Sequence, residues 1–221
     1  MMKDGWGIFF SFAYVILILI IAKRAEVKGW VSPFAARKLI HLFVGSWILP
    51  TFFLFDHWFM AILPPFCFIW VNLYLERKRF FSFEKREAGY GTVYFPISFV
   101  LLLTLFWEEP LRLYACFGGL SMAWGDSLAA LVGKIWGRHR YSIGQTQKSL
   151  EGSLAMMGSA FGACLVSFLI FQPGPFQERI VQSGLIAVVA TVTESLFGRG
   201  IDNMAVPLGS AGFGYFLLTR F

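Results

Sequence analysis

Charged residues are scarce in this chain of 221 residues: they make up 14%, against 57% hydrophobic and 19% aromatic residues. Soluble domains contain about 25% charged and about 45–50% apolar residues. The shortage of charge therefore excludes a soluble enzyme, a coiled coil and a disordered chain. Because each transmembrane helix takes up about 20 residues, the chain is too short for both a full helical bundle and a large soluble domain. The sequence predicts a single membrane domain over residues 1–221.

Cysteine is also scarce. Cys67, Cys116 and Cys164 lie within apolar runs and lack the spacing of metal ligands, so they predict neither a disulfide framework nor a zinc site. The sequence contains no internal repeat and no low-complexity tract. The first apolar run lacks a strongly basic leader and a small-residue cleavage site, which favours a retained helix over a signal peptide.

Eight apolar runs predict an all-α integral membrane protein, a polytopic bundle of about eight transmembrane helices. The runs cover residues 6–22, 38–55, 57–75, 90–107, 111–133, 151–171, 180–197 and 204–219. The last run is short and rich in glycine. If it is re-entrant, seven full spans remain.

Lys and Arg are distributed unevenly among the connecting segments. The segments after the first, third, fifth and seventh runs carry five, five, four and one of them, and only four of the 19 lie elsewhere. By the positive-inside rule, these odd-numbered loops face the cytoplasm and both termini are extracytoplasmic. The net charge of +6 thus reports orientation and contact with lipid headgroups, and we expect no nucleic-acid partner.

Three acids fall inside apolar runs, where a carboxylate costs about 2.5–3.5 kcal/mol on insertion scales. Asp126, Glu151 and Glu194 each lie on a stripe of small residues at three- and four-residue spacing, the kind of face that packs against other helices. Such stripes also serve ordinary helix packing, and a lone buried acid is often a structural hydrogen-bond acceptor. Three inward-facing acids at the same cytoplasmic depth nevertheless predict a functional site.

Basic residues are predicted at the same membrane face. Arg37 and His41 are four residues apart, with Lys38 beside them. The segment 134–149 adds further basic residues and glycines, a combination suited to a polyphosphate. Residues 144–149 (GQTQKS) superficially resemble a P-loop, but they lack the glycine before the lysine and a preceding strand, so we reject that match.

Asp202 and Asn203 follow Glu194 closely, in the last cytoplasmic loop. Carboxylate oxygens from Asp126, Glu194 and Asp202 would suit Mg²⁺, which prefers oxygen ligands and substrate phosphates. The alternative for Asp202 and Asn203 is an ordinary turn or helix cap.

Five ordered motifs between residues 37 and 209 resemble the polyprenol kinase family, which includes dolichol, phytol and CTP-dependent diacylglycerol kinases. The motifs are RKLIHLFVG (37–45), GTVYFP (91–96), GDSLAALVGKIWG (125–137), KSLEG (148–152) and TESLFGRGIDNMAVPLG (193–209). Integral-membrane phosphatidate cytidylyltransferases look like more distant relatives. Their Gly-Asp-Leu and His-Gly-Gly elements have no counterpart here, which favours the kinase branch.

The resemblance implies a CTP-dependent kinase that transfers the γ-phosphate of CTP to a membrane lipid alcohol, with Mg²⁺. It also implies site residues. The catalytic candidates are Asp126, His41 and Lys148; the nucleotide- or phosphate-binding candidates are Arg37, Lys38, Lys134, Arg138, Lys148, Ser149, Glu151 and Asn203; and the metal-ligand candidates are Asp126, Glu194 and Asp202.

Several alternatives stay open at this point. Asp126 or His41 could take the proton of the lipid hydroxyl. The acceptor could be phytol, a polyprenol, dolichol or diacylglycerol, and the sequence does not indicate an oligomeric state. The runner-up activity is cytidylyl transfer to a lipid phosphate. An ion-coupled transporter is weaker, because the polar groups gather at one face instead of the midplane and no inverted repeat is present.

Overall fold

The computed structural model describes residues 2–77, 90–143 and 146–220. Its helices are α1 (Met2–Val27), α2 (Pro33–Ser46), α3 (Ile48–Leu54), α4 (Trp58–Ala61), α5 (Leu63–Arg77), α6 (Gly91–Leu105), α7 (Arg112–Leu120), the π-helical segment η2 (Ser121–Asp126), α8 (Ser127–Trp136), α9 (Leu150–Phe171), α10 (Phe176–Leu196) and α11 (Asp202–Arg220). Strands within the described residues are limited to one antiparallel hairpin, β1 (Arg140–Ile143) and β2 (Thr146–Ser149). Most of the basic segment after the third apolar run, and Gly144 in the segment 134–149, lie outside these ranges.

Each of the eight predicted apolar runs is helical, which confirms the all-α class. Among the described residues, five helical stretches are long and apolar enough to cross a membrane: α1, α4–α5 together, α7–η2–α8 together, α9 and α10. The apolar helix α6 is shorter. The protein is therefore an integral membrane protein with several spans.

Prolines account for the breaks within the second and third runs. The second run changes from α2 to α3 at Trp47, because Pro50 has no amide hydrogen to donate to the carbonyl of Ser46. The third run breaks at Ile62, which leaves Pro64 and Pro65 in the first turn of α5, where prolines are tolerated.

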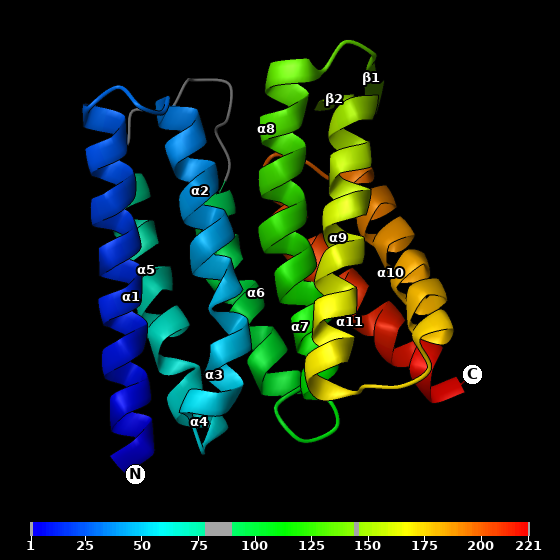
Figure 1. The fold of residues 1–221 in the computed structure, drawn as a ribbon. Helices are drawn as coiled ribbons and strands as arrows, with labels where there is room; N and C mark the ends of the chain where they lie inside the picture. Colours follow the sequence, from blue (N-terminus) through cyan, green and yellow to red (C-terminus); the bar gives the residue numbers. More distant parts are fainter. Residues whose placement is uncertain (1, 78–89, 144–145, 221) are drawn as a thin grey trace.

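The continuous rod α7–η2–α8 forms the centre of the bundle. In its most apolar stretch 72% of the residues are buried, compared with 22% in α1 and 11% in α4–α5. It packs against α2, α9 and α11 (Figure 1). Within α7, residues Leu113 to Phe117 and Leu120 belong to the main apolar core. Asp126, midway along the rod, is consequently buried.

The two ends of the bundle differ. Figure 1 shows both termini toward one end, whereas the β1–β2 hairpin and the connection between α1 and α2 lie at the other end. The hairpin follows α8 and leads directly into α9. The basic segment 134–149 therefore lies at the end of the bundle opposite the termini.

Close helix contact at Gly118 provides a test of this packing. A Cβ added at Gly118 would overlap the carbonyl oxygen of Pro207 in α11, whereas one added at Gly158 in α9 would meet nothing within 4 Å. We expect Gly118→Ala to lower the free energy of unfolding by about 1–3 kcal/mol, the usual cost of overpacking. Gly158→Ala is the matched control, compared by denaturant or thermal unfolding in detergent. Equal stability of the two variants would contradict the contact between α7 and α11.

Candidate active site

Asp126 ends the π-helical segment and is buried. A π-turn carries an extra residue, and such turns are frequent at functional sites. Trp124, within the same segment, donates from Nε1 to the hydroxyl of Ser46 at 2.9 Å, which ties η2 to α2. The irregular turn and this bond together fix the position from which the Asp126 carboxylate faces α2.

Lys38 and His41 of α2 both approach the same oxygen of Asp126. The Lys38 Nζ lies 2.7 Å from Oδ2, and the Nδ1 of His41 lies 3.6 Å from it. The His41 ring meets the ring of Phe95 edge to face, with the centroids 3.9 Å apart. Its Nε2 is buried without a hydrogen-bond partner among the described residues. One nitrogen of His41 is thus directed at Asp126, and the other is buried without a partner among the described residues.

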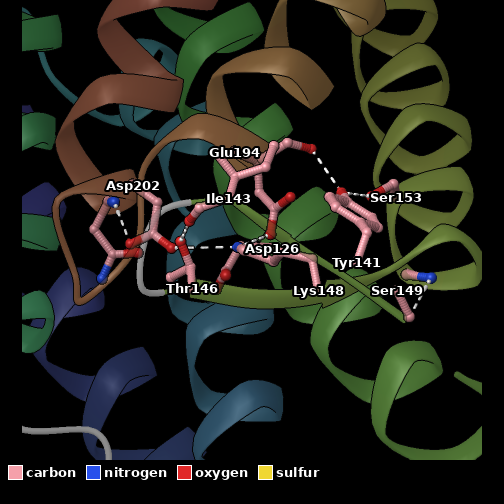
Figure 2. Close-up of polar contacts among 12 residues, drawn as sticks. Asp126, Tyr141, Ile143, Thr146, Lys148, Ser149, Ser153, Glu194 and Asp202 are labelled. Carbon is pink, nitrogen blue, oxygen red and sulfur yellow. Dashed lines mark hydrogen bonds and ion pairs between the residues drawn. The ribbon is translucent and has the colours of Figure 1, made fainter. Parts of the chain in front are cut away.

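Lys148 reaches a second pair of carboxylates from β2. Its ammonium forms an ion pair with Glu194 of α10 and lies 4.0 Å from Oδ2 of Asp202, the first residue of α11 (Figure 2). Burial alone lowers the pKa of Lys148, but the negative charges of Glu194, Asp202 and Asp126 outweigh it and raise the pKa above its ordinary value. Lys148 therefore stays charged at neutral pH.

We call Lys38, Asp126, Lys148, Glu194 and Asp202 the charged cluster. Its members come from five separate elements, namely α2, η2, β2, α10 and α11. All five side chains are at least four-fifths buried. Buried charges persist in proteins only when they are paired, and here three carboxylates face two ammonium groups.

The other predicted site residues lie around this cluster or apart from it. The Arg37 guanidinium lies over the ring of Phe34, as does the ammonium of Lys134, at 5.7 Å and 4.0 Å from the ring centroid. Arg138 is exposed beyond the end of α8. Ser149 caps α9 by accepting from the amide of Gly152. None of these contacts involves the carboxylates of the charged cluster.

Glu151 and Asn203 make contacts of a structural kind. Glu151 accepts from the His139 backbone amide and lies 2.7 Å from its Nδ1, so it faces the hairpin and not the charged cluster. The prediction that it shares an inward site with Asp126 and Glu194 is not met. Asn203 donates to the carbonyl of Gly91 at 2.7 Å, which joins α11 to α6. A role for either residue in nucleotide binding stays a prediction.

Sequence reasoning missed Tyr141. Its hydroxyl lies 2.6 Å from the hydroxyl of Ser153 in α9 and 3.0 Å from that of Ser195 in α10 (Figure 2). Tyr141 falls in a basic segment whose strands have no strong sequence signature. In the sequence, only the position of its partner Ser195 next to Glu194 could have indicated a polar contact here.

The predicted metal ligands do not form a ready coordination shell. No group of three His, Cys, Asp or Glu side chains within residues 2–77, 90–143 and 146–220 is arranged to hold a metal ion. Asp126 and Glu194 are each paired with a lysine, and Asp202 lies beside Lys148. The residues as arranged therefore do not fit a preformed Mg²⁺ site, and Mg²⁺ stays a prediction from the sequence.

Three curated proteins are similar to this chain. A phytol kinase from Synechocystis sp. is 38% identical over 177 residues, which cover 79% of this chain and 76% of that protein. A dolichol kinase from Saccharomyces cerevisiae is 29% identical over 87% of this chain, and a CTP-dependent diacylglycerol kinase 1 from Schizosaccharomyces pombe is 28% identical over 61%. The matches span 38% and 63% of the lengths of these two proteins. No protein-family model matches the chain, and no solved structure matches it significantly.

The fold and the site define a polytopic membrane protein with a buried cluster of lysines and carboxylates. The similarity to the phytol kinase covers more than two thirds of both chains, at an identity well above 30%. The chain belongs to the polyprenol kinase family of membrane-bound lipid kinases.

The ion pair between Lys148 and Glu194 yields a stability prediction. Glu194→Gln should leave the buried ammonium of Lys148 without its ion-pair partner, with Asp202 at 4.0 Å and the more distant Asp126 as the remaining carboxylates. We expect a loss of about 1–3 kcal/mol in the free energy of unfolding, less than the 3–5 kcal/mol for a charge that loses its last partner. Glu178→Gln, an exposed glutamate in the first turn of the same helix, is the control. Equal denaturation midpoints for the two variants would show that the ion pair between Lys148 and Glu194 does not contribute to the free energy of unfolding.

Proposed function

We propose that this protein is a CTP-dependent lipid-alcohol kinase, which transfers the γ-phosphate of CTP to the hydroxyl of an isoprenoid alcohol of the phytol, polyprenol or dolichol type, or of diacylglycerol. The observation that carries the proposal is the charged cluster, buried within a membrane bundle of this family. Phosphoryl transfer depends mainly on positioning and on neutralisation of charge. The buried ammonium groups of Lys38 and Lys148 supply positive charge, and His41 lies beside Lys38 at Asp126.

In the proposed reaction, the oxygen of the lipid hydroxyl attacks the γ-phosphorus of CTP. The bond from this phosphorus to the oxygen bridging to the β-phosphate breaks, and CDP leaves with that oxygen. Lys38 and Lys148 neutralise phosphate charge, with Arg37, Lys134 and Arg138 as further basic groups near the nucleotide. The products are a lipid monophosphate, CDP and one proton.

His41 is the group we assign to accept the proton of the lipid hydroxyl. Its Nε2 is buried without a partner among the described residues, while its Nδ1 is directed toward Asp126. The Oδ2 of Asp126, in contrast, already accepts from Lys38 at 2.7 Å. A carboxylate bound to an ammonium is a weaker base than an unpaired imidazole nitrogen. Asp126 then orients His41 and holds Lys38.

We further propose that the hairpin end of the bundle faces the cytoplasm and that both termini are extracytoplasmic. The excess of Lys and Arg after the odd-numbered runs supports this orientation. The position of the hairpin opposite both termini agrees with it (Figure 1). The lipid alcohol would enter sideways from the inner leaflet, so that its tail stays in the membrane. Residues 1–221 would act together as one transmembrane catalytic domain, because the charged cluster draws on elements from α2 to α11.

Labelled CTP tests the reaction. Purified protein supplied with CTP labelled at the γ-phosphate should transfer label to phytol, farnesol-type alcohols, dolichol, undecaprenol or diacylglycerol, and the panel identifies the acceptor. CTP labelled at the α-phosphate should leave the lipid unlabelled. Transfer of the α-label to a lipid phosphate would instead establish cytidylyl transfer and refute the kinase assignment.

The role of His41 has its own test. We expect His41→Gln to lower kcat by about 10²–10⁴-fold, the usual contribution of a general base, with little change in the KM for CTP. His57→Gln, whose Nδ1 contacts Asp4 near the N-terminus, is the control and should keep its activity. If Asp126→Asn loses activity while His41→Gln retains it, Asp126 is the base and the assignment to His41 is wrong.

A further inference from the structure

The hairpin that carries Lys148 is held to the bundle by a hydroxyl on its other strand. Tyr141 and Lys148 are direct partners in the antiparallel register of β1 and β2. Directly opposed residues of an antiparallel pair project their side chains from the same face of the ladder. Tyr141 and Lys148 therefore leave the hairpin on the same side, and both reach α10 (Figure 2).

The two side chains engage successive residues of that helix. Lys148 pairs with Glu194, and the Tyr141 hydroxyl lies 3.0 Å from the hydroxyl of Ser195. The same hydroxyl lies 2.6 Å from Ser153 of α9. A phenol has one donor and two acceptor positions, so it can satisfy both serines at once. Tyr141 thus joins the hairpin to α9 and α10 at one point beside the charged cluster.

A two-stranded hairpin needs such support, because it is at best marginally stable in isolation. At its base, the amide of Leu150 donates to the carbonyl of His139 at 2.9 Å, and Glu151 binds His139. Thr146 lies against Gly198, where an added Cβ would overlap its methyl group. The hairpin accordingly lies close to the segment between α10 and α11, and Tyr141 is its polar contact with both α9 and α10.

We propose that Tyr141 is a positioning residue, which holds the hairpin on α9 and α10 so that Lys148 stays at the charged cluster. This inference rests on the proposed function for its effect on nucleotide use. The hydroxyl of Tyr141 contacts Ser153 and Ser195 and not the carboxylates or lysines of the charged cluster. Without its hydroxyl, the hairpin separates more readily from the helices, and Lys148 is no longer held where phosphate charge must be neutralised.

Tyr141→Phe tests the proposal, with Tyr14→Phe as the matched control. Tyr14 also loses one hydroxyl hydrogen bond, to the carbonyl of Phe43 at 2.9 Å, but that bond joins α1 to α2. We expect Tyr141→Phe to raise the KM for CTP by about 3- to 10-fold, the range that corresponds to loss of one or two net hydrogen bonds. The KM for the lipid alcohol should stay unchanged. Ser195→Ala should also raise the KM for CTP. In the double variant with Tyr141→Phe, the Ser195→Ala change should raise the KM by less than it does alone.

Trypsin supplies a second readout, independent of catalysis, because Arg140 and Lys148 lie in the hairpin strands. Cleavage after these residues should be several-fold faster in Tyr141→Phe than in the wild type or in Tyr14→Phe. An unchanged cleavage rate in Tyr141→Phe would overturn the proposal, even if activity falls. The hydroxyl would then affect activity without holding the hairpin on the helices. Since proteolysis needs no CTP or lipid, a wild-type protein without kinase activity would refute the proposed function alone.

Discussion

The contact between Lys38 and Asp126 is the interaction on which the rest of the site depends. A carboxylate in the middle of the most buried helical rod is costly unless a positive charge accompanies it. The Nζ of Lys38, 2.7 Å away, supplies that charge from α2. Because α2 must lie close to η2 for the pair to form, His41, one turn further along α2, is also brought against Asp126. One ion pair thereby orders the acid, the histidine and the contact between two helices.

The other buried carboxylates, Glu194 and Asp202, also need a positive partner, which comes from a strand. Glu194 and Asp202 lie at the adjoining ends of α10 and α11, and the matching charge comes from a strand outside the helical rods. A lysine on a hairpin is less firmly fixed than one on a packed helix. The hairpin therefore needs contacts of its own with the bundle, and Tyr141, His139 and Thr146 provide them at three separate points. The two lysines of the charged cluster consequently differ in the rigidity of their supports.

Composition and spacing were sufficient to predict the helices and to single out residues that the structure brings together in the charged cluster. Long apolar runs define helices because unpaired backbone groups are not tolerated in lipid, and isolated acids within them mark where charge must be paired. The π-turn at Ser121–Asp126 could not be foreseen, since one extra residue per turn leaves no mark in composition. The sequence also could not predict that Lys38, the neighbour of Arg37, forms the ion pair with Asp126, because the partner depends on the rotation of α2 about its axis. Glu151 was misplaced because helical spacing does not reveal that His139 lies beside it in the hairpin connection.

The balance of charge bears on how a polyphosphate could be received. Three carboxylates and two ammonium groups leave the cluster negative overall, so it does not attract a nucleotide by itself. Attraction has to come from basic groups outside it, such as Lys134 in the last turn of α8, Arg138 between α8 and β1, and Arg140 in β1, all of which are exposed. Within the cluster, Lys38 and Lys148 reach phosphate oxygens only in competition with the carboxylates that now bind them. The carboxylates keep both lysines charged and in position, and a triphosphate would have to displace these carboxylates in order to bind the lysines.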